Sequence, residues 1–174
     1  MSQDEIFPIV DTEGRTIGRA TRRECHSGSR LLHPVVHLHV VSSDGRLLLQ
    51  RRSADKDIQP GRWDTSVGGH VDYGESVPDA LRREAAEELS LTEFEPRGLG
   101  AYVFESDRER ELVNVFTTTV DDCNGLRFQE SEISEIRLFT PAEIEAMTGT
   151  GALTPNFEQE YRRIASNLLN YIPQ

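Results

Sequence analysis

Residues 68–91 read GGHVDYGESVPDALRREAAEELSL, a glycine pair and a polar loop followed by a run of helix-forming residues. Ser76 is a suitable N-cap for a helix that extends to about Leu89. Leu81, Ala85 and Leu89 recur at helical spacing and form one apolar stripe. The stretch therefore predicts a loop and an amphipathic helix that packs against a sheet.

Three glutamates gather beside this stripe. Glu84, Glu87 and Glu88 are separated by helical spacings, so their like charges repel one another. A divalent cation such as Mg²⁺ would remove that cost, because it takes carboxylate oxygens and keeps waters that a substrate phosphate can replace. A solvated acidic face is the ordinary alternative, but no lysine lies nearby to pair with these side chains, and Arg83 points elsewhere, toward Glu75. The pattern favours a metal site.

Length and composition indicate one domain over residues 1–174. The net charge of −11 opposes binding to nucleic acid or to an anionic membrane, because both are polyanions. No apolar run approaches the roughly 18 residues of a membrane span, and the N-terminus lacks the regions of a signal peptide. We therefore expect a cytoplasmic protein with a small-molecule partner and with no nucleic-acid or membrane partner.

The remaining sequence mixes β-hairpins with a few helices. Apolar, β-rich runs on both sides of turn residues predict three hairpins, and capping signals predict two further helices. The hairpins cover residues 1–24, 34–53 and 98–120. One of the two helices begins at Thr140, and the other spans residues 154–172. Because strands do not alternate with helices, this order indicates an α+β fold with helix layers around a sheet, rather than parallel βαβ units.

The spacing inside residues 69–91 is G, five residues, E, seven residues and then REAAEELSL. This pattern resembles the Nudix box, G-x5-E-x7-R-E-U-x-E-E-x-G-U, in which U is a bulky aliphatic residue. The two departures are Ala85 at the first aliphatic position and Ser90 in place of glycine. Neither departure removes a carboxylate, so the chain resembles the Nudix hydrolase superfamily.

The resemblance implies a Nudix-type αβα sandwich with a mixed β-sheet, here preceded by an N-terminal β-hairpin. It also implies a metal-dependent enzyme that cleaves the diphosphate bond of a nucleoside diphosphate or other organic diphosphate, with Mg²⁺ or Mn²⁺ at the box. The matching catalytic and metal positions are Glu84, Glu87, Glu88 and the carbonyl of Gly68, and the structural positions are Gly69, Glu75 and Arg83. Glu84 is either a ligand or the base that orients water, and Glu130 or Glu132 is the candidate for a further glutamate.

Three further segments, ECHSGSRLLHP, QRRSADKDIQPGRWDTSVGGHV and RERELVNVF, are similar to isopentenyl-diphosphate isomerase, a branch of the same superfamily. This similarity implies a second divalent ion, Mn²⁺, Zn²⁺ or Mg²⁺, held by histidines and glutamates. The matching residues are His26, His33, His70, Glu109 and Glu111. The similarity also implies that Arg52 and Lys56 bind the substrate diphosphate. His37 and His39, which alternate on one strand, have no such match and are predicted to be structural.

Gly68 separates this chain from the isomerase. The isomerase has at the matching position the cysteine that moves a proton at the allylic carbon, and glycine cannot transfer a proton. The acidic box, which the isomerase largely lacks, is complete in this chain. We therefore predict a Nudix pyrophosphohydrolase, with an isopentenyl-diphosphate isomerase-like enzyme and a non-catalytic diphosphate-binding module as alternatives. The N-terminal edge hairpin offers a surface for a homodimer.

Overall fold

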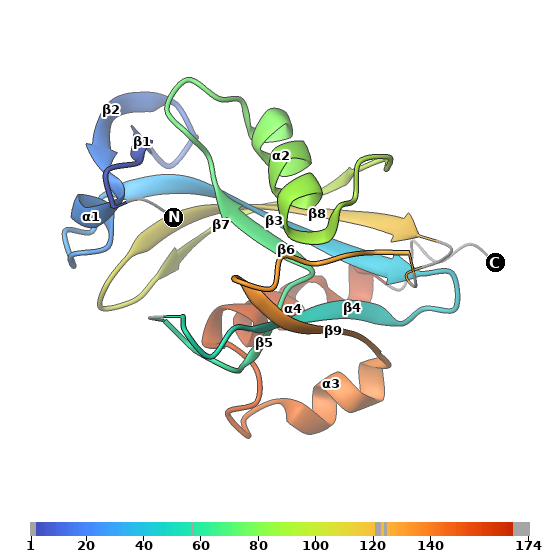
Figure 1. The fold of residues 1–174 in the computed structure, drawn as a ribbon. Helices are drawn as coiled ribbons and strands as arrows, with labels where there is room; N and C mark the ends of the chain where they lie inside the picture. Colours follow the sequence, from blue (N-terminus) through green and yellow to red (C-terminus); the bar gives the residue numbers. More distant parts are fainter. Residues whose placement is uncertain (1–2, 57, 121–122, 124, 169–174) are drawn as a thin grey trace.

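A computed structural model of the chain describes residues 3–56, 58–120, 123 and 125–168. A β-sheet forms its centre, and helices cover both faces of the sheet (Figure 1). The strands are β1 (Ile6–Val10), β2 (Thr16–Thr21), β3 (Leu32–Ser42), β4 (Leu47–Arg52), β5 (Trp63–Asp64), β6 (Val67–His70), β7 (Arg97–Glu105), β8 (Arg110–Val120) and β9 (Ile133–Phe139). The helices are α1 (Arg22–Cys25), α2 (Val77–Leu89), α3 (Pro141–Met147) and α4 (Pro155–Leu168). None of the described helices is long and apolar enough to cross a membrane.

Strand β3 is the centre of the sheet. It pairs in parallel with β8 along its whole length and antiparallel with β6. β7 extends the sheet beyond β8, and β4 pairs antiparallel with β5 and β9. The sheet is therefore mixed, as predicted.

The hairpin over residues 34–53 differs from its prediction. A turn connects β3 to β4 as expected, but among the described residues only Val41 and Leu47 pair between these strands. The strands then separate because β6 occupies the edge of β3 that β4 would otherwise take. Ser66 bridges the opening: its hydroxyl accepts a hydrogen bond from a backbone N–H of β3 at 2.8 Å and donates one to a carbonyl of β4 at 2.5 Å.

Two apolar cores lie on opposite faces of the sheet, because successive side chains of a strand point to opposite sides. The core under α2 includes Leu81, Ala85 and Leu89, as the helical stripe predicts, with Val36 and Leu38 of β3. The core under α3 and α4 includes Ile144, Phe157, Tyr161 and Ile164, with Val35 of β3. These layers confirm the αβα sandwich (Figure 1). The C-terminal helix was predicted over residues 154–172, of which 169–172 lie outside the described residues.

The helix ends follow their sequence signals. Ser76 accepts a hydrogen bond from the N–H of Asp79 at 3.3 Å, and Thr140 and Glu143 form a capping box. Ser90, at the glycine position of the box, ends α2 in the left-handed conformation with a φ of 53°. Because this conformation costs an L residue about 1–2 kcal/mol, Ser90 carries strain that glycine would avoid.

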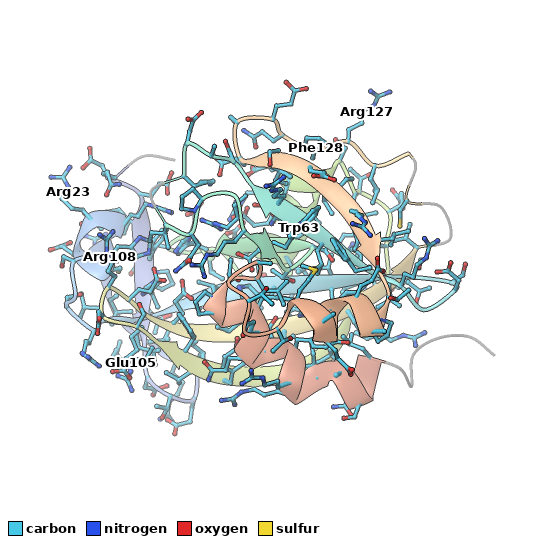
Figure 2. All side chains as sticks on the ribbon, turned by 90° about the horizontal axis from the view of Figure 1, so that it is seen from below. Arg23, Trp63, Glu105, Arg108, Arg127 and Phe128 are labelled. Atoms are coloured by element: carbon cyan, nitrogen blue, oxygen red, sulfur yellow. The ribbon has the colours of Figure 1, made fainter. Side chains whose placement is uncertain are left out.

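The N-terminal hairpin is confirmed. β1 and β2 form a separate antiparallel sheet, and α1 follows directly. Phe7 and Cys25 are buried together in a small core at this end. Figure 2 shows Arg23 of α1 and Arg108 of the β7–β8 turn at the same end of the molecule. The hairpin thus covers the end of the central sheet where β3 begins.

Candidate active site and metal centre

The space beside Gly69 holds the side chain of Glu84. β6 runs along α2, and a β-carbon on residue 69 would lie 2.0 Å from Cδ and 2.2 Å from Oε1 of Glu84. Such a distance is shorter than any real contact, so a larger residue would displace the carboxylate. The glycine of the box therefore has a direct steric role in positioning Glu84.

Glu88 is the most deeply buried of the three box glutamates, with 7% of its surface exposed. Its Oε2 accepts hydrogen bonds from the backbone N–H of Gly68 and from the side chain of Gln50, both at 3.1 Å. Burial, followed by the charge of Glu84, raises the pKa of Glu88 to about 8. Burial also raises the pKa of Glu84 to about 7. Both carboxylates are costly to ionise without a cation, as expected for residues that fit a metal ion.

Arg83 braces the loop and also reaches the acidic face. Its Nε and Nη2 donate to the carboxylate of Glu75, each at 2.9 Å, and Nη2 also donates to the carbonyl of His70 at 2.9 Å. Its Nη1 donates to Glu84 at 2.7 Å and lies 3.5 Å from Glu87, whose side chain is 55% exposed. The expectation that Arg83 points away from the glutamates is wrong, because its long, forked side chain reaches both sides of the helix surface.

Basic side chains gather between the box and the N-terminal end of β3. Lys56 forms an ion pair with Glu132 and lies close enough to the box glutamates for their charges to act on it. Burial lowers the pKa of Lys56, and the positive charges of Arg52 and Arg22 contribute to the shift. Arg52 and Lys56 were predicted from sequence, whereas Arg22 was missed. Mutually repelling cations of this kind form a suitable site for a diphosphate.

The two candidates for a further glutamate lie in different surroundings. Glu132 contacts Lys56, and the loop before it is tied to the box by a hydrogen bond of 3.3 Å from the N–H of Gln129 to the carbonyl of Glu88. Glu130 is exposed. The geometry therefore favours Glu132 as the residue that faces the box.

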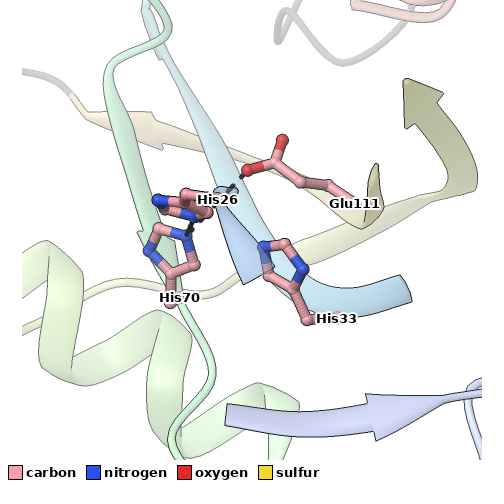
Figure 3. A group of neighbouring side chains, drawn as sticks. All are labelled: His26, His33, His70 and Glu111. Atoms are coloured by element: carbon pink, nitrogen blue, oxygen red, sulfur yellow. Dashed lines mark hydrogen bonds and ion pairs between the residues drawn. The ribbon is translucent and has the colours of Figure 1, made fainter. Parts of the chain in front are cut away.

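A cluster of four side chains, which we call the His/Glu cluster, lies at the N-terminal end of β3. Its members are His26, His33, His70 and Glu111, and their ligand atoms all lie within 4.8 Å of one another. Figure 3 shows the three rings and the carboxylate together. They come from the end of α1, from β3, from β6 and from β8. The parallel pairing of β3 with β8 places His33 opposite Glu111, which no spacing in the sequence reveals.

The protonation of His33 suits a metal ligand. Its Nδ1 donates to the carbonyl of Leu31 at 3.0 Å, so Nε2 has a free lone pair in the neutral ring. His33 is fully buried, and its Nε2 has no hydrogen-bond partner in the part of the chain that the structure describes. A histidine whose other nitrogen donates to a carbonyl is the usual arrangement of a metal ligand. An orphaned buried acceptor in such a cluster fits a divalent ion.

The other two histidines of the cluster lie against the N-terminal hairpin. The Nε2 atoms of His26 and His70 are 3.1 Å apart, and Nη1 of Arg22 is 3.3 Å from Nδ1 of His70. Phe7 of β1 stacks on His70 with the ring centroids 4.4 Å apart. Burial, followed by Arg22, lowers the pKa of His26 to about 4 and lowers that of His70 as well. Both rings are therefore neutral at pH 7, which is the form that binds a metal.

Glu109 and the box glutamates are arranged less tightly. Glu109, the fifth residue predicted for the second site, has Oε2 3.8 Å from Nε2 of His26 but lies outside the group of four. Among the described residues, the three box glutamates do not form such a group. Binding of one ion by Glu84, Glu87 and Glu88 therefore needs side-chain rotation or bridging waters, which Mg²⁺ commonly keeps.

Sequence reasoning missed a buried polar network on the face of β3 that α4 covers. His37 and His39 both contact the carboxylate of Glu160, at 3.0 Å and 2.6 Å. The alternation of the two histidines predicted that they share a face, but nothing in the sequence pointed to Glu160 on α4. Trp63, near the box in sequence and labelled in Figure 2, packs edge-on against the buried ring of Phe139.

Comparisons with known proteins cover most of the chain. The profile of the NUDIX domain matches residues 31–163. An uncharacterized Nudix hydrolase of Yersinia pestis is 31% identical over 170 residues, which cover 92% of this chain and 92% of the relative. Another, of Pseudomonas aeruginosa, is 34% identical over 140 residues, or 80% and 81% of the two chains.

Solved structures show the same fold. The crystal structure of DR0079 from Deinococcus radiodurans has a TM-score of 0.78 and 27% identity, and the match covers 91% of this chain and 98% of that chain. The MutT protein from Methanosarcina mazei has a TM-score of 0.67 and 25% identity, covering 78% and 94%. The matched profile contains the box and most of the His/Glu cluster, whereas Arg22 and His26 precede it.

Proposed function

We propose that this chain, which belongs to the Nudix family, is a metal-dependent hydrolase that cleaves the diphosphate bond of a nucleoside diphosphate or another organic diphosphate with water. The observation that carries the proposal is the pair of buried glutamates, Glu84 and Glu88, fixed beside a glycine pair and facing basic side chains. Burial makes both carboxylates costly to ionise, and a bound divalent cation would offset that cost.

Each site residue has a role in this reaction. Glu87, Glu88 and the carbonyl of Gly68 hold Mg²⁺ or Mn²⁺, and Glu84 is a further ligand or takes the proton of the attacking water. When bound, the ion polarises the phosphoryl group and lowers the pKa of water. Lys56, Arg52 and Arg22 bind the diphosphate oxygens, and Glu75 with Arg83 keeps the loop in place. Glu132, held by Lys56, is the further glutamate.

The His/Glu cluster is proposed as a second site for Mn²⁺, Zn²⁺ or Mg²⁺. The support is the free, buried Nε2 of His33 and the neutral state of His26 and His70. Glu111 supplies a carboxylate inside the cluster, and Glu109 lies at its margin. Arg22 donates to Nδ1 of His70, so the neutral ring carries its hydrogen on Nε2, which then has no free lone pair for an ion. Binding of an ion by Nε2 of His70 would therefore require this contact to break.

The cluster also favours a second candidate function, an isopentenyl-diphosphate isomerase-like enzyme. The position of Gly68 argues against it, because glycine offers no group for proton transfer. Incubation with isopentenyl diphosphate distinguishes the two functions. Formation of the dimethylallyl isomer without phosphate release would favour the isomerase, and release of phosphate would favour the hydrolase.

A substrate panel tests the proposed function directly. The purified protein is incubated in Mg²⁺ or in Mn²⁺ with nucleoside diphosphate sugars, dinucleoside polyphosphates, nucleoside triphosphates and prenyl diphosphates. Hydrolysis of at least one compound at a diphosphate bond, dependent on the metal, is expected. A panel without any metal-dependent product would contradict the proposal.

Gly69→Ala is expected to abolish most activity while the protein stays folded. The added methyl group collides with the far end of Glu84, which is a flexible side chain, so the carboxylate moves and the backbone does not. Thermal unfolding and metal-dependent turnover measure the two effects. Gly98→Ala is the matched control, because its methyl group meets nothing within 4 Å. Equal activity in the two variants would show that the position of Glu84 is unimportant.

His26→Gln is expected to weaken metal binding at the His/Glu cluster and to leave metal binding at the box unchanged. Its imidazole is a member of the His/Glu cluster and lies at the end of a short helix, and glutamine keeps a neutral polar side chain at this position. Titration with Zn²⁺ or Mn²⁺ should show an affinity at this site that is lower by at least about tenfold. Changes to residues that only support a ligand already cause a loss of about this size, so removal of a ligand should cost no less. Mg²⁺ binding at the box should remain. Unchanged binding of every ion would contradict a metal at the cluster.

The metal-free protein is expected to become less stable as the pH rises from about 6.5 to 8. Glu84, Glu88 and Glu111 have folded-state pKa values of about 7, 8 and 8, above the unfolded value of 4.5. Their contribution is therefore complete below pH 4.5 and is lost as the pH rises through 7 to 8. Thermal unfolding in a chelator measures this decline. Added Mg²⁺ should offset it, and a flat pH profile in chelator would contradict the prediction.

A further inference from the structure

Gln50 is a polar residue at a position of β4 where the strand pattern favours an apolar one. The strand begins with Leu47, Leu48 and Leu49, and successive side chains point to opposite faces of the sheet. Leu47 and Leu49 belong to the core under α3 and α4, whereas Leu48 belongs to the core under α2. Gln50 follows on the α2 face and is 6% exposed. A buried amide lowers stability unless it is hydrogen-bonded, so this residue needs a partner.

The partner of Gln50 is one of the glutamates of the box. Nε2 of Gln50 donates to Oε2 of Glu88 at 3.1 Å. A carboxylate that binds a cation only accepts hydrogen bonds, so the amide nitrogen must face it. The backbone N–H of Gly68 donates to the same oxygen, also at 3.1 Å. Among the described residues, no hydrogen bond reaches Oε1, which is therefore left for another group.

The two donors come from opposite sides of the opening in the sheet. Gly68 lies on β6, which pairs with β3, whereas Gln50 lies on β4, which pairs with β5 and β9. Among the described residues, β3 and β4 pair only where Val41 meets Leu47. Glu88 therefore joins the two parts of the sheet, because it accepts one hydrogen bond from each.

The part of the sheet that contains β4 also carries groups that are proposed to bind the diphosphate. Arg52 ends β4, and Lys56 follows in the next loop. The backbone N–H of Ser53 donates to the carbonyl of Glu132 at 2.9 Å, and Lys56 forms an ion pair with the side chain of Glu132. Gln50 thus connects the strand of these cations to a carboxylate of the metal site. Such a contact fixes the distance between groups that must act on one substrate.

We propose that Gln50 is a positioning residue for the metal site at the box. Its amide holds Oε2 of Glu88, so that Oε1 is presented to the ion in a fixed orientation. The same contact keeps this ligand at a constant distance from Arg52 and Lys56. Hydrogen-bonded partners of this kind orient metal ligands and raise metal affinity. The inference rests on the proposed hydrolase function and adds a residue to its metal site.

Calorimetric titration of the metal-free protein with Mg²⁺ tests this role without turnover. The binding that Glu88→Gln loses identifies the site at the box. Gln50→Met removes the donor and keeps a side chain of similar length, and it is expected to lower the affinity of that site by about tenfold or more. Leu48→Met is the matched control, because it changes a buried side chain on the same face of β4 and removes no hydrogen bond. Its Mg²⁺ affinity should equal that of the wild type.

A double-mutant cycle shows whether Gln50 acts through Glu88. At a fixed concentration, Mg²⁺ raises the unfolding temperature by an amount that depends on its affinity. Gln50→Met should reduce this rise in the wild-type background. In the Glu88→Gln background it should have no further effect, because the carboxylate that Gln50 orients is absent. A residue that acts only through packing would instead lower the unfolding temperature equally in chelator and in Mg²⁺.

Gln50→Asn decides the question if Gln50→Met does not fold. The shorter side chain keeps the amide but withdraws it by one carbon, so the contact with Glu88 is lost. The same loss of Mg²⁺ affinity is expected.

Two results would overturn the inference and leave the proposed function intact. One is wild-type Mg²⁺ affinity in the Gln50 variants, and the other is an equal loss in Gln50→Met and Leu48→Met. Failure of the proposed function looks different. Mg²⁺ binding that depends on Gln50, without turnover of any compound in the substrate panel, would support the inference and contradict hydrolysis. A wild type that neither binds Mg²⁺ nor turns over any compound would contradict both.

Discussion

Glu88→Gln is expected to lose metal-dependent turnover by roughly 10²–10⁴-fold, which corresponds to several kcal/mol of transition-state stabilisation by a bound ion. The amide keeps the size of the side chain and its hydrogen bond from Gly68, but it removes the charge that the ion needs. The metal-free variant should unfold at the same temperature as the wild type or above it, since ionised Glu88 is costly in its buried position.

The measurement is turnover of the best compound in the substrate panel, together with thermal unfolding in chelator. Glu145→Gln is the matched control, because it makes the same chemical change at an exposed position on α3. Its turnover should equal that of the wild type. Full activity of Glu88→Gln would mean that the buried carboxylate has no part in the chemistry.

Glu160→Gln is expected to lower the free energy of unfolding by about 3–5 kcal/mol, the usual cost of removing one partner of a buried ion pair. His37 and His39 would remain buried against a neutral amide. For a chain of this length, the loss corresponds to a fall of roughly 6–20 °C in the unfolding temperature.

Denaturant and thermal unfolding at pH 7 measure this loss. Arg162→Gln is the matched control on the same helix, since its side chain is 68% exposed and its change should stay within about 0.5 kcal/mol. A loss for Glu160→Gln as small as that of the control would show that water, and not the histidines, satisfies the carboxylate.

The parts of the fold that the sequence predicted are those with local causes. Ser76 and Thr140 are caps whose partners lie three residues away, and both helices begin there. The apolar stripe of α2 follows from helical spacing alone. The sequence did not predict the separation of β4 from β3, because it depends on β6 taking the edge of β3.

The sequence predicted the box more directly than it predicted the His/Glu cluster. The box is continuous in sequence, so its glutamates and the pairing of Glu75 with Arg83 follow from spacing. The His/Glu cluster joins four elements, and only the resemblance to a known enzyme brought its residues together before the structure did. Arg22 and Glu160 carried no signal in the sequence, because their histidine partners are 48 and more than 120 residues away.

Calorimetric titration of metal-free protein with Mg²⁺ and Mn²⁺ is the most direct test of the metal site at the box. We expect saturable binding by the wild type and loss of the site at the box in both Glu84→Gln and Glu88→Gln, with the folded state and any binding at the His/Glu cluster intact in each. Absence of binding by the wild type, or binding by both variants equal to that of the wild type, would show that these buried glutamates do not hold a metal ion.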